Sequence, residues 1–394
     1  MSTSSGDPVL VADQDELDRA VAAARLGGAM GLDTEFVRER TYRARLCVVQ
    51  ISTAERTFVI DALSSVDLDG VAGLISDPEV ETVVHAGRQD LEIFHERYGS
   101  LPSRVFDVQL AAGFVGHGAS LPYEGLVRSV LGFRVAKGES YTDWSRRPLT
   151  GAQLRYAADD VRHLLPAAAR LRAEAEKLGR DEWVREEMAL LSEPGSFEVN
   201  VGDAWRKVGG RRSLNERQLA VLKRLAAWRE ETAMRRDLPR GWVLKDPTLL
   251  EIARRSPSSM GALKEIRGMP VKEAERSGRA LLAAVQQAKS DPPGEPATGP
   301  PRELQMRARL LAGMADAVVR ARCEQARVAY ELVTTRADLE AALIDAISPA
   351  PRGRARLLTG WRRAVAGDAL LALAAGKVAV KAIEEPPYVS EVAV

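Results

Sequence analysis

The chain has 394 residues, of which 28% are charged and 45% hydrophobic, and its formal net charge is +1. This composition is typical of globular proteins and excludes collagen-like and wholly disordered classes, while the length predicts two or three domains. The two cysteines, Cys47 and Cys323, are far apart in the sequence, which excludes a disulfide scaffold and a thiolate zinc site. No apolar run reaches the roughly 18 residues of a membrane helix and no signal peptide is recognisable, so we expect a cytoplasmic protein.

The first two hundred residues alternate between helix-like and strand-like segments. Three short runs rich in Val and Ile lie within a few residues of one another, as in an antiparallel meander. The pattern predicts a mixed α/β domain at 1–212, whose sheet forms early in the chain and is covered by helices. The expected helices are at 13–26, 66–75, 89–97, 121–131 and 151–177, and the expected strands are at 29–37, 45–53, 56–62, 81–85 and 105–108, the last being either a strand or the entry to a helix.

Beyond residue 213 the pattern predicts helices only. Ser213 and Glu216 have the spacing of a capping box in front of a long amphipathic helix. The segment DPPGEPATGPP is too rich in proline and glycine for regular structure and predicts a semi-rigid linker. The expected divisions are a helical unit at 213–290, a linker at 291–301, a second helical unit at 302–380 and a mobile tail at 381–394.

Charge is unevenly distributed between these parts. Residues 1–212 carry more acidic than basic side chains, whereas 213–290 carry more basic than acidic ones. A basic surface attracts polyanions, and an acidic cluster attracts divalent cations. A face of solvated arginines explains the basic excess equally well.

The segment LDTEF, residues 32–36, holds the first candidate site. On a strand, Asp33 and Glu35 point to the same face. Two carboxylates about 4 Å apart repel by roughly 4 kcal/mol at an effective dielectric of about 20, so a cation is expected between them. A hard divalent ion suits such oxygen ligands. The structural alternative is a strand end with two solvated acids paired with Arg38 or Arg40.

Two further segments hold candidate acids. In VVHAGRQDLEIF, Asp90 falls in the first turn of a helix that follows a strand, where an acid also has a purely stabilising role. In YAADDVRHLL, Tyr156 and Asp160 are four residues apart and share a helix face, although Asp159 also has a compatible spacing. A phenol beside a carboxylate suits a site where the acid holds a metal and the hydroxyl positions a water; a core tyrosine with solvated acids is the alternative.

The three exonuclease motifs of ribonuclease D and its DEDD relatives resemble segments of this chain: LDTEFVRERTY, HAGRQDLEIF and YTDWSRRPLTGAQLRYAADDVRHLLP. The third belongs to the subclass in which Tyr precedes Asp by four positions, which selects Asp160 over Asp159. The segment LNERQLAVLKRLAAWRE resembles an HRDC module, and AYELVTTRADLEAAL is similar to a second, weaker HRDC-like region. The resemblance implies a ribonuclease H-like α/β exonuclease domain, a mixed sheet with covering helices, followed by one or two all-α HRDC-type domains.

The resemblance also implies the chemistry. Asp33, Glu35 and Asp160 are expected to hold one divalent ion, Mg²⁺ or Mn²⁺. Asp33 then bridges to a second ion that Asp90 supports, and Tyr156 orients the attacking water. His85 is expected to be structural, as is Asp107 unless it supports the ligands from outside the metal site.

The expected function is metal-dependent 3′–5′ exoribonuclease activity that releases nucleoside 5′-monophosphates from single-stranded 3′ ends of tRNA precursors or other structured RNA. The alternatives are a catalytically silent RNA-binding protein and the same chemistry on DNA. No organic cofactor or membrane partner is expected. The residues expected to contact RNA are Arg38, Arg40, Lys137, Arg146, Arg147, Arg235, Arg236, Arg240, Trp242 and Lys245.

Overall fold

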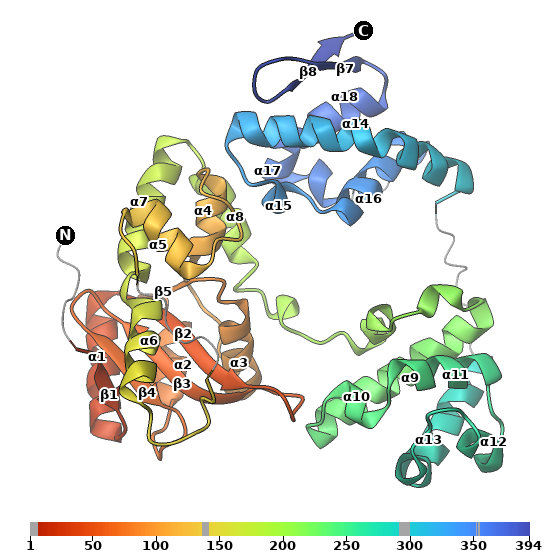
Figure 1. Ribbon diagram of the computed structural model, residues 1–394, viewed down its shortest axis with the longest axis horizontal. Helices are drawn as coiled ribbons and strands as arrows, with labels where there is room; N and C mark the ends of the chain where they lie inside the picture. The colour runs from red at the N-terminus through yellow and green to blue at the C-terminus, as the bar shows by residue number, and fades with distance from the viewer. Residues whose placement is uncertain (1–6, 136–141, 291–299, 352, 354) are drawn as a thin grey trace. The chain divides into compact units, whose positions relative to one another are not determined.

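The computed structural model describes residues 7–135, 142–290, 300–351, 353 and 355–394 (Figure 1). The described residues form two compact units. Unit 1 combines the chain up to Glu35 with Leu46–Ser196 and the residues from 300 onward, and unit 2 combines Phe36–Arg45 with the residues from Phe197 to 290. Among the described helices, none is long and apolar enough to cross a membrane.

The N-terminal part of unit 1 is built on a six-stranded mixed sheet with the order β1-β4-β3-β2-β5-β6. Strands β3 and β4 pair antiparallel, whereas β1 with β4, β2 with β5 and β5 with β6 pair in parallel. The predicted mixed sheet is therefore confirmed, and only the three-residue strand β1 was missed. The strands are β1 (Val9–Val11), β2 (Ala29–Val37), β3 (Arg45–Ser52), β4 (Thr57–Asp61), β5 (Glu81–Val84) and β6 (Val105–Asp107).

Helices cover this sheet, and α6 lies across one of its faces (Figure 1). The single helix predicted at 151–177 is two helices that meet at His163. Pro166 explains the break, because it lacks the N–H that would bond to the Arg162 carbonyl and its ring collides with that carbonyl. The helices are α1 (Gln14–Gly27), α2 (Asp69–Ser76), α3 (Arg88–Tyr98), α4 (Val108–Phe114), α5 (Tyr123–Leu131), α6 (Gly151–Arg162), α7 (Leu164–Lys177), α8 (Asp181–Ala189) and the 3-10 turn Pro194–Ser196.

Unit 2 is helical apart from the β2–β3 segment. Its long helix α9 begins at an Asn215–Gln218 capping box, so the predicted Ser213–Glu216 box is wrong by two residues. The predicted boundary at 212 is also wrong, because Ala204 and Val208 pack into the core of this unit. The helices are α9 (Glu216–Arg236), α10 (Arg240–Val243), α11 (Asp246–Arg255), α12 (Met260–Lys264) and α13 (Val271–Ser290), preceded by 3-10 turns at Val201–Lys207 and Arg211–Ser213.

The C-terminal part of unit 1 is a second helical region that ends in a hairpin. The tail predicted to be mobile is ordered, since β7 and β8 pair antiparallel and Glu391 accepts from Arg322 at 2.7 Å. Nearly all of the predicted linker lies outside the described residues. The elements are α14 (Arg302–Ala326), α15 (Tyr330–Val333), α16 (Arg336–Ile347), a 3-10 turn (Arg356–Leu358), α17 (Gly360–Arg362), a π-helical turn (Arg363–Gly367), α18 (Asp368–Ala374), β7 (Val378–Ala382) and β8 (Val389–Ala393).

Candidate active site

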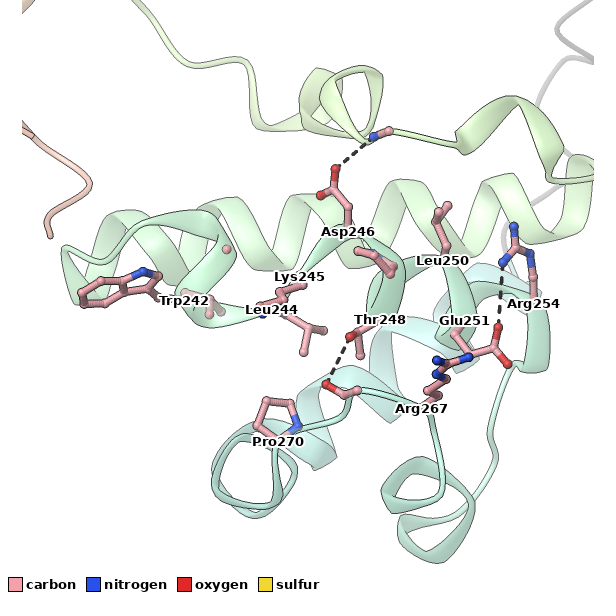
Figure 2. A pocket seen from close by; sticks show the side chains of 15 residues that line it. Trp242, Leu244, Lys245, Asp246, Thr248, Leu250, Glu251, Arg254, Arg267 and Pro270 are labelled. Carbon is pink, nitrogen blue, oxygen red and sulfur yellow. Dashed lines mark hydrogen bonds and ion pairs between the residues drawn. The ribbon is translucent and has the colours of Figure 1, made fainter. Parts of the chain in front are cut away.

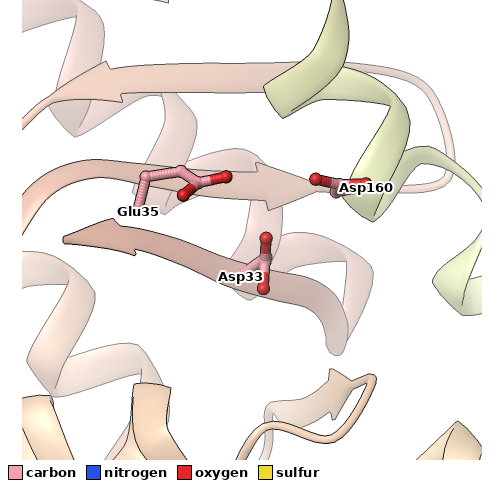
Figure 3. Close-up of side chains that lie close together, drawn as sticks. All are labelled: Asp33, Glu35 and Asp160. Atoms are coloured by element: carbon pink, nitrogen blue, oxygen red, sulfur yellow. The ribbon is translucent and has the colours of Figure 1, made fainter. Parts of the chain in front are cut away.

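Three carboxylates lie close together where α6 packs beside β2. Asp33 and Glu35 project from β2, and Asp160 projects from α6. One oxygen of each lies within 4.8 Å of the others, and Figure 3 shows the three side chains directed toward one another. Because all three are carboxylates, the group offers only hard oxygen donors, which fit a divalent cation such as Mg²⁺ or Mn²⁺.

Close packing brings α6 to β2. A Cβ atom at Gly31 would lie 2.3 Å from the Ser52 Oγ and 3.2 Å from the Leu164 Cβ, so only glycine permits this approach. The same Ser52 hydroxyl donates to the Val161 carbonyl at 2.7 Å and holds the helix next to Asp160. The sequence alone showed no reason for Gly31 to precede the acidic strand.

Asp90 lies in the first turn of α3 and is 6% exposed. Its carboxylate accepts a hydrogen bond from the Thr34 hydroxyl, and its charge contributes to raising the pKa of Asp33. It is not a member of the group that Asp33 forms with Glu35 and Asp160. Asp90 is therefore adjacent to the cluster. The hydrogen bond from Thr34 ties its carboxylate to β2, the strand that carries Asp33 and Glu35.

Tyr156 and Asp160 share one face of α6, as the helix spacing predicts. The Tyr156 hydroxyl hydrogen-bonds the Asp160 carboxylate. Asp159 instead forms an ion pair with Arg162 at 3.4 Å. The rotation of the helix thus resolves the choice between the two adjacent acids, because only Asp160 is directed to the other carboxylates.

A cavity of about 290 Å³ lies over the cluster. Sequence reasoning missed Tyr123 as one of its lining residues. The Tyr123 hydroxyl accepts from the His163 N–H at 3.1 Å, and its ring packs edge-on against His85. No spacing in the sequence relates Tyr123 to the acids, so no local signal could have identified it. The lining residues are Leu32, Asp33, Thr34, Glu35, His85, Tyr123, Tyr156, Asp160 and Leu164.

His85 and Asp107 have structural partners. His85 Nε2 donates to the Leu121 carbonyl at 3.0 Å, and burial lowers the histidine pKa, so the ring stays neutral near pH 7. Asp107 is 2% exposed and accepts from the backbone N–H groups of Ala86 and Gly87. It also accepts from the first turn of α4, which it caps. The hydrogen bonds described here are made within the protein, which gives both residues a structural role.

The carboxylates hold protons more tightly than ordinary acids. Burial, followed by repulsion from Asp160 and Asp90, raises the pKa of Glu35 from 4.5 to about 8. Burial also raises the pKa of Asp160 and of Asp90 to about 7, and that of Asp33 well above its ordinary value. Such a concentration of negative charge is stable at neutral pH when protons or a cation neutralise it.

These pKa shifts predict how the stability of the metal-free protein depends on pH. A folded-state pKa above the unfolded one stabilises the fold fully below the unfolded pKa, and this contribution is lost as the pH rises through the folded pKa. For Glu35 and Asp160 the loss therefore runs from about pH 4 to about pH 8. We expect the thermal unfolding midpoint of the metal-free protein to fall between pH 5 and 8, measured by calorimetry.

Adding Mn²⁺ at pH 8 is expected to raise that midpoint, because the ion binds only the folded state. Glu35→Gln removes one of these carboxylate titrations and is expected to flatten the decline. A midpoint that rises steadily from pH 5 to 8 in the metal-free protein would contradict the raised pKa values.

The basic residues expected near the acids have different surroundings. Arg38 and Arg40 are exposed in the segment that follows β2. Arg146 is 84% exposed and forms a surface ion pair at 3.1 Å with a nearby aspartate. Arg147, in contrast, is bound inside unit 1 to Asp61. Lys137 lies outside the described residues.

Three arginines of unit 2 that were expected to contact RNA are used within the unit. Arg236 donates to both oxygens of Glu273 at 3.0 Å. Arg240 pairs with the buried Glu230. Arg235 donates to a threonine hydroxyl one turn earlier in α9. The guanidinium groups of Arg236 and Arg240 therefore stabilise the unit, because leaving the partly buried Glu273 or the buried Glu230 unpaired would be costly.

Trp242 and Lys245 remain accessible at a second cavity, of about 1120 Å³, beside α10 and α11 (Figure 2). Trp242 is 61% exposed at one end of this cavity, and Lys245 is exposed along it. Arg254 and Arg267 lie toward the other end (Figure 2). An exposed indole beside several cations is a suitable surface for a base and its phosphates.

Comparisons with known proteins agree with this arrangement. A family model described as 3′-5′ exonuclease matches residues 8–176, and one described as HRDC domain matches residues 218–285. Together with the mixed sheet and the carboxylate cluster, these matches define a 3′–5′ exonuclease with an HRDC domain. The acidic cluster is accordingly a candidate divalent-metal site.

Proteins named ribonuclease D match nearly the whole chain. Those of Gluconacetobacter diazotrophicus and Granulibacter bethesdensis are each 40% identical, covering 94% of this chain and 94% and 93% of their own. The crystal structure of Escherichia coli RNase D, described as an exoribonuclease involved in structured RNA processing, superposes with a TM-score of 0.77 at 32% identity, covering 93% of this chain and 99% of that one. The chain belongs to the ribonuclease D family and is a 3′–5′ exoribonuclease.

Proposed function

We propose that the chain hydrolyses single-stranded 3′ ends of structured RNA, tRNA precursors among them, with two divalent ions, and releases nucleoside 5′-monophosphates. The observation that carries the proposal is the convergence of Asp33, Glu35 and Asp160 beside Tyr156. The RNA preference is supported by the description of the E. coli relative.

Each ligand has a proposed place in this scheme. Asp33, Glu35 and Asp160 would hold one ion, and Asp33 and Asp90 would hold the second. Bound ions supply Lewis-acid stabilisation of the phosphoryl oxygens and make a water easier to deprotonate. Thr34 keeps the Asp90 carboxylate oriented, which limits the rearrangement needed on binding.

Tyr156 would orient the attacking water. Burial, followed by the nearby charge of Asp160, raises the pKa of its phenol, so the hydroxyl stays protonated at neutral pH. One lone pair of that oxygen is available to accept from water while the hydroxyl donates to Asp160. The water then loses a proton as its oxygen adds to phosphorus, and the bond from phosphorus to the 3′ oxygen of the preceding nucleotide breaks. That oxygen takes up a proton and becomes the new 3′-hydroxyl, while the terminal nucleotide leaves as a 5′-monophosphate.

The size of the cavity supports a single-stranded substrate. At about 290 Å³ it is at the lower limit of pockets that enclose a drug-sized ligand. That size suits one terminal nucleotide better than a paired terminus. We therefore expect a duplex end to fray before its last phosphodiester reaches the carboxylates.

A substrate panel tests the proposal. A 5′-labelled tRNA with a 3′ tail is expected to shorten stepwise in Mg²⁺ or Mn²⁺ and to release mononucleotides, whereas the same RNA with its tail paired shortens slowly and chelation stops both. RNA binding without mononucleotide release under any divalent ion would favour the silent binding protein. Equal rates on a matched DNA would remove the RNA preference.

We propose that the Trp242 cavity of unit 2 also contacts RNA. Stacking one base on an aromatic side chain contributes about 1–3 kcal/mol, and a lysine adds a phosphate contact. The proposal is supported by the exposure of Trp242 and Lys245 in the same cavity.

Trp242→Ala is expected to weaken binding of a 3′-tailed tRNA by roughly tenfold, measured by fluorescence anisotropy in Ca²⁺ to prevent turnover. Trp242→Phe retains most of the affinity, because it keeps an aromatic face. Lys245→Ala is expected to reduce the slope of the logarithm of RNA affinity against the logarithm of salt concentration by about one, because one phosphate contact is lost. Lys264, which is exposed outside the cavity, is the matched control, and an equal effect of Lys264→Ala would argue against a specific site.

A further inference from the structure

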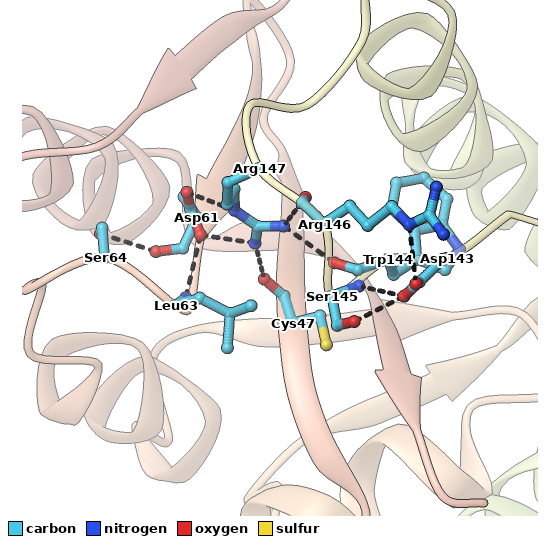
Figure 4. Close-up of polar contacts among 9 residues, drawn as sticks. All are labelled: Cys47, Asp61, Leu63, Ser64, Asp143, Trp144, Ser145, Arg146 and Arg147. Atoms are coloured by element: carbon cyan, nitrogen blue, oxygen red, sulfur yellow. Dashed lines mark hydrogen bonds and ion pairs between the residues drawn. The ribbon is translucent and has the colours of Figure 1, made fainter.

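Arg147 lies between α5 and α6, and within the described part of the chain its guanidinium bonds only to residues of unit 1. Its Nε and Nη2 each donate to one carboxylate oxygen of Asp61 at 2.6 Å. Nη2 also donates to the Cys47 carbonyl at 2.8 Å, and Nη1 donates to the carbonyls of Trp144 and Arg146 at 2.8 and 2.7 Å (Figure 4). A guanidinium has five N–H donors, and all of them are used here. No donor remains for a phosphate of RNA.

The ion pair with Asp61 is strong for its position. The two side chains are only 25% and 15% exposed, and the contact is bidentate, the geometry in which arginine binds a carboxylate best. Burial alone would raise the pKa of Asp61, but the hydrogen bonds from Arg147 and from Leu63 outweigh it and the pKa is lowered. The carboxylate is therefore charged at neutral pH. Arg147 thus ties its own segment to the ends of β3 and β4.

That segment reaches the active site through Trp144. The Trp144 side chain is 4% exposed, and its ring lies 6.0 Å from the ring of Tyr156 at an angle of 40°. The segment also contacts the start of α6, where Thr142 Oγ1 accepts from Gln153 Nε2 at 3.1 Å. The segment therefore contacts both the Tyr156 ring and the start of the helix that carries it.

We propose that Arg147 is a positioning residue of the active site: by fixing its segment to Asp61 and the Cys47 carbonyl, it holds Trp144 against Tyr156 and so places the Tyr156 hydroxyl. The proposal rests on the role proposed for Tyr156 in catalysis. It replaces the sequence-based expectation that Arg147 contacts RNA. Removal of Asp61 distinguishes the two roles. If Arg147 positions the segment, loss of Asp61 weakens that positioning. If Arg147 binds an RNA phosphate, loss of Asp61 frees its guanidinium to do so.

A double-mutant cycle on a 3′-tailed RNA tests the coupling. Arg147→Ala is expected to lower kcat by about tenfold to a hundredfold, the range that a small misplacement of a reacting group causes, with KM changed less than about threefold. In a Tyr156→Phe background the same change is expected to lower kcat by less than about threefold, because the hydroxyl that it misplaces is absent. Asp61→Ala is expected to reproduce Arg147→Ala, and Arg147→Lys to recover part of kcat.

Other outcomes overturn the proposal. An equal loss of kcat in both backgrounds would mean a general loss of structure. A rise in KM that steepens with salt while kcat is retained, or tighter RNA binding by Asp61→Ala, would mean a phosphate contact. Unchanged kcat in Arg147→Ala would exclude any role. If Tyr156→Phe alone does not change kcat, the proposed catalytic role of Tyr156 is wrong. The single variant therefore separates that outcome from a failure of the role proposed for Arg147.

Hydrogen exchange on the metal-free protein gives a readout that does not depend on activity. Arg147→Ala is expected to lower protection at Thr142–Ser145 and in the first turn of α6. The Arg25–Asp77 pair, at 3.2 Å elsewhere in unit 1, is the matched control, and Arg25→Ala is expected to leave both segments protected. If Arg147→Ala does not fold, Asp61→Asn replaces it in the cycle. Retained protection at Thr142–Ser145 in either variant would contradict the proposal.

Discussion

Asp33→Asn is expected to reduce release of the 3′-terminal nucleotide by about a thousandfold or more. Asp33 is the member of the cluster proposed to contact both ions, and the ions contribute several kcal/mol of charge stabilisation in the transition state. Each 1.36 kcal/mol corresponds to a factor of ten in rate. Asp160→Asn is expected to have a similar effect. The measurement is a single-turnover assay with 5′-labelled, 3′-tailed RNA in Mg²⁺.

The adjacent acid supplies the control for this experiment. Asp159 differs from Asp160 by one position but pairs with Arg162, and Asp159→Asn is expected to change the rate less than about threefold. Asp33→Asn is not expected to unfold the protein, because the amide removes a charge whose neighbours repel it. Comparable rates for Asp33→Asn and the unmodified chain would contradict the proposed site.

Tyr156→Phe is expected to lower kcat by about a hundredfold while KM changes little. Groups that position or transfer a proton in the transition state contribute about 10²- to 10⁴-fold, and this substitution removes only the hydroxyl. The phenylalanine ring keeps its packing against Trp144. Calorimetric titration with Mn²⁺ is expected to give the same affinity for both proteins, since the carboxylates are unchanged.

Tyr98→Phe is the matched control for loss of a phenol. Tyr98 ends α3 outside the cavity that lies over the cluster, and its removal is expected to leave kcat within about twofold. A large loss of Mn²⁺ affinity in Tyr156→Phe would instead indicate that the phenol supports the metal site. A kcat equal to that of the unmodified chain would show that the water is oriented by another group.

Local sequence patterns predicted most of the secondary structure of the exonuclease part. Strand alternation placed Asp33 and Glu35 on one face, because the side-chain period of a strand is two whatever surrounds it. Helix spacing likewise placed Tyr156 above Asp160. The same spacing did not exclude Asp159, since the sequence of α6 does not specify which of two adjacent residues faces the sheet.

Errors arose where a contact with a distant segment decides the structure. The tail predicted to be mobile forms the β7–β8 hairpin, and Glu391 on it is paired with Arg322. Arg147 was expected to contact RNA because it is a basic residue, yet its guanidinium N–H groups donate to Asp61 and to a carbonyl of β3. The hairpin itself is a local pairing, but Arg322 and Asp61 are dozens of residues from the residues that they bind, and a window of local sequence carries no information about such pairs.

The amino-acid sequence by itself determined the spacing of the candidate residues and the type of each element that carries them, because periodicity and motif spacing are local properties. Only the tertiary structure showed that the rotation of α6 directs Asp160, the acid selected by the family resemblance, toward Asp33. It alone showed that Gly31 lets the helix approach and that partly buried arginines serve the fold. Those outcomes depend on which surfaces pack together, since burial and pairing of charges are properties of the folded chain as a whole.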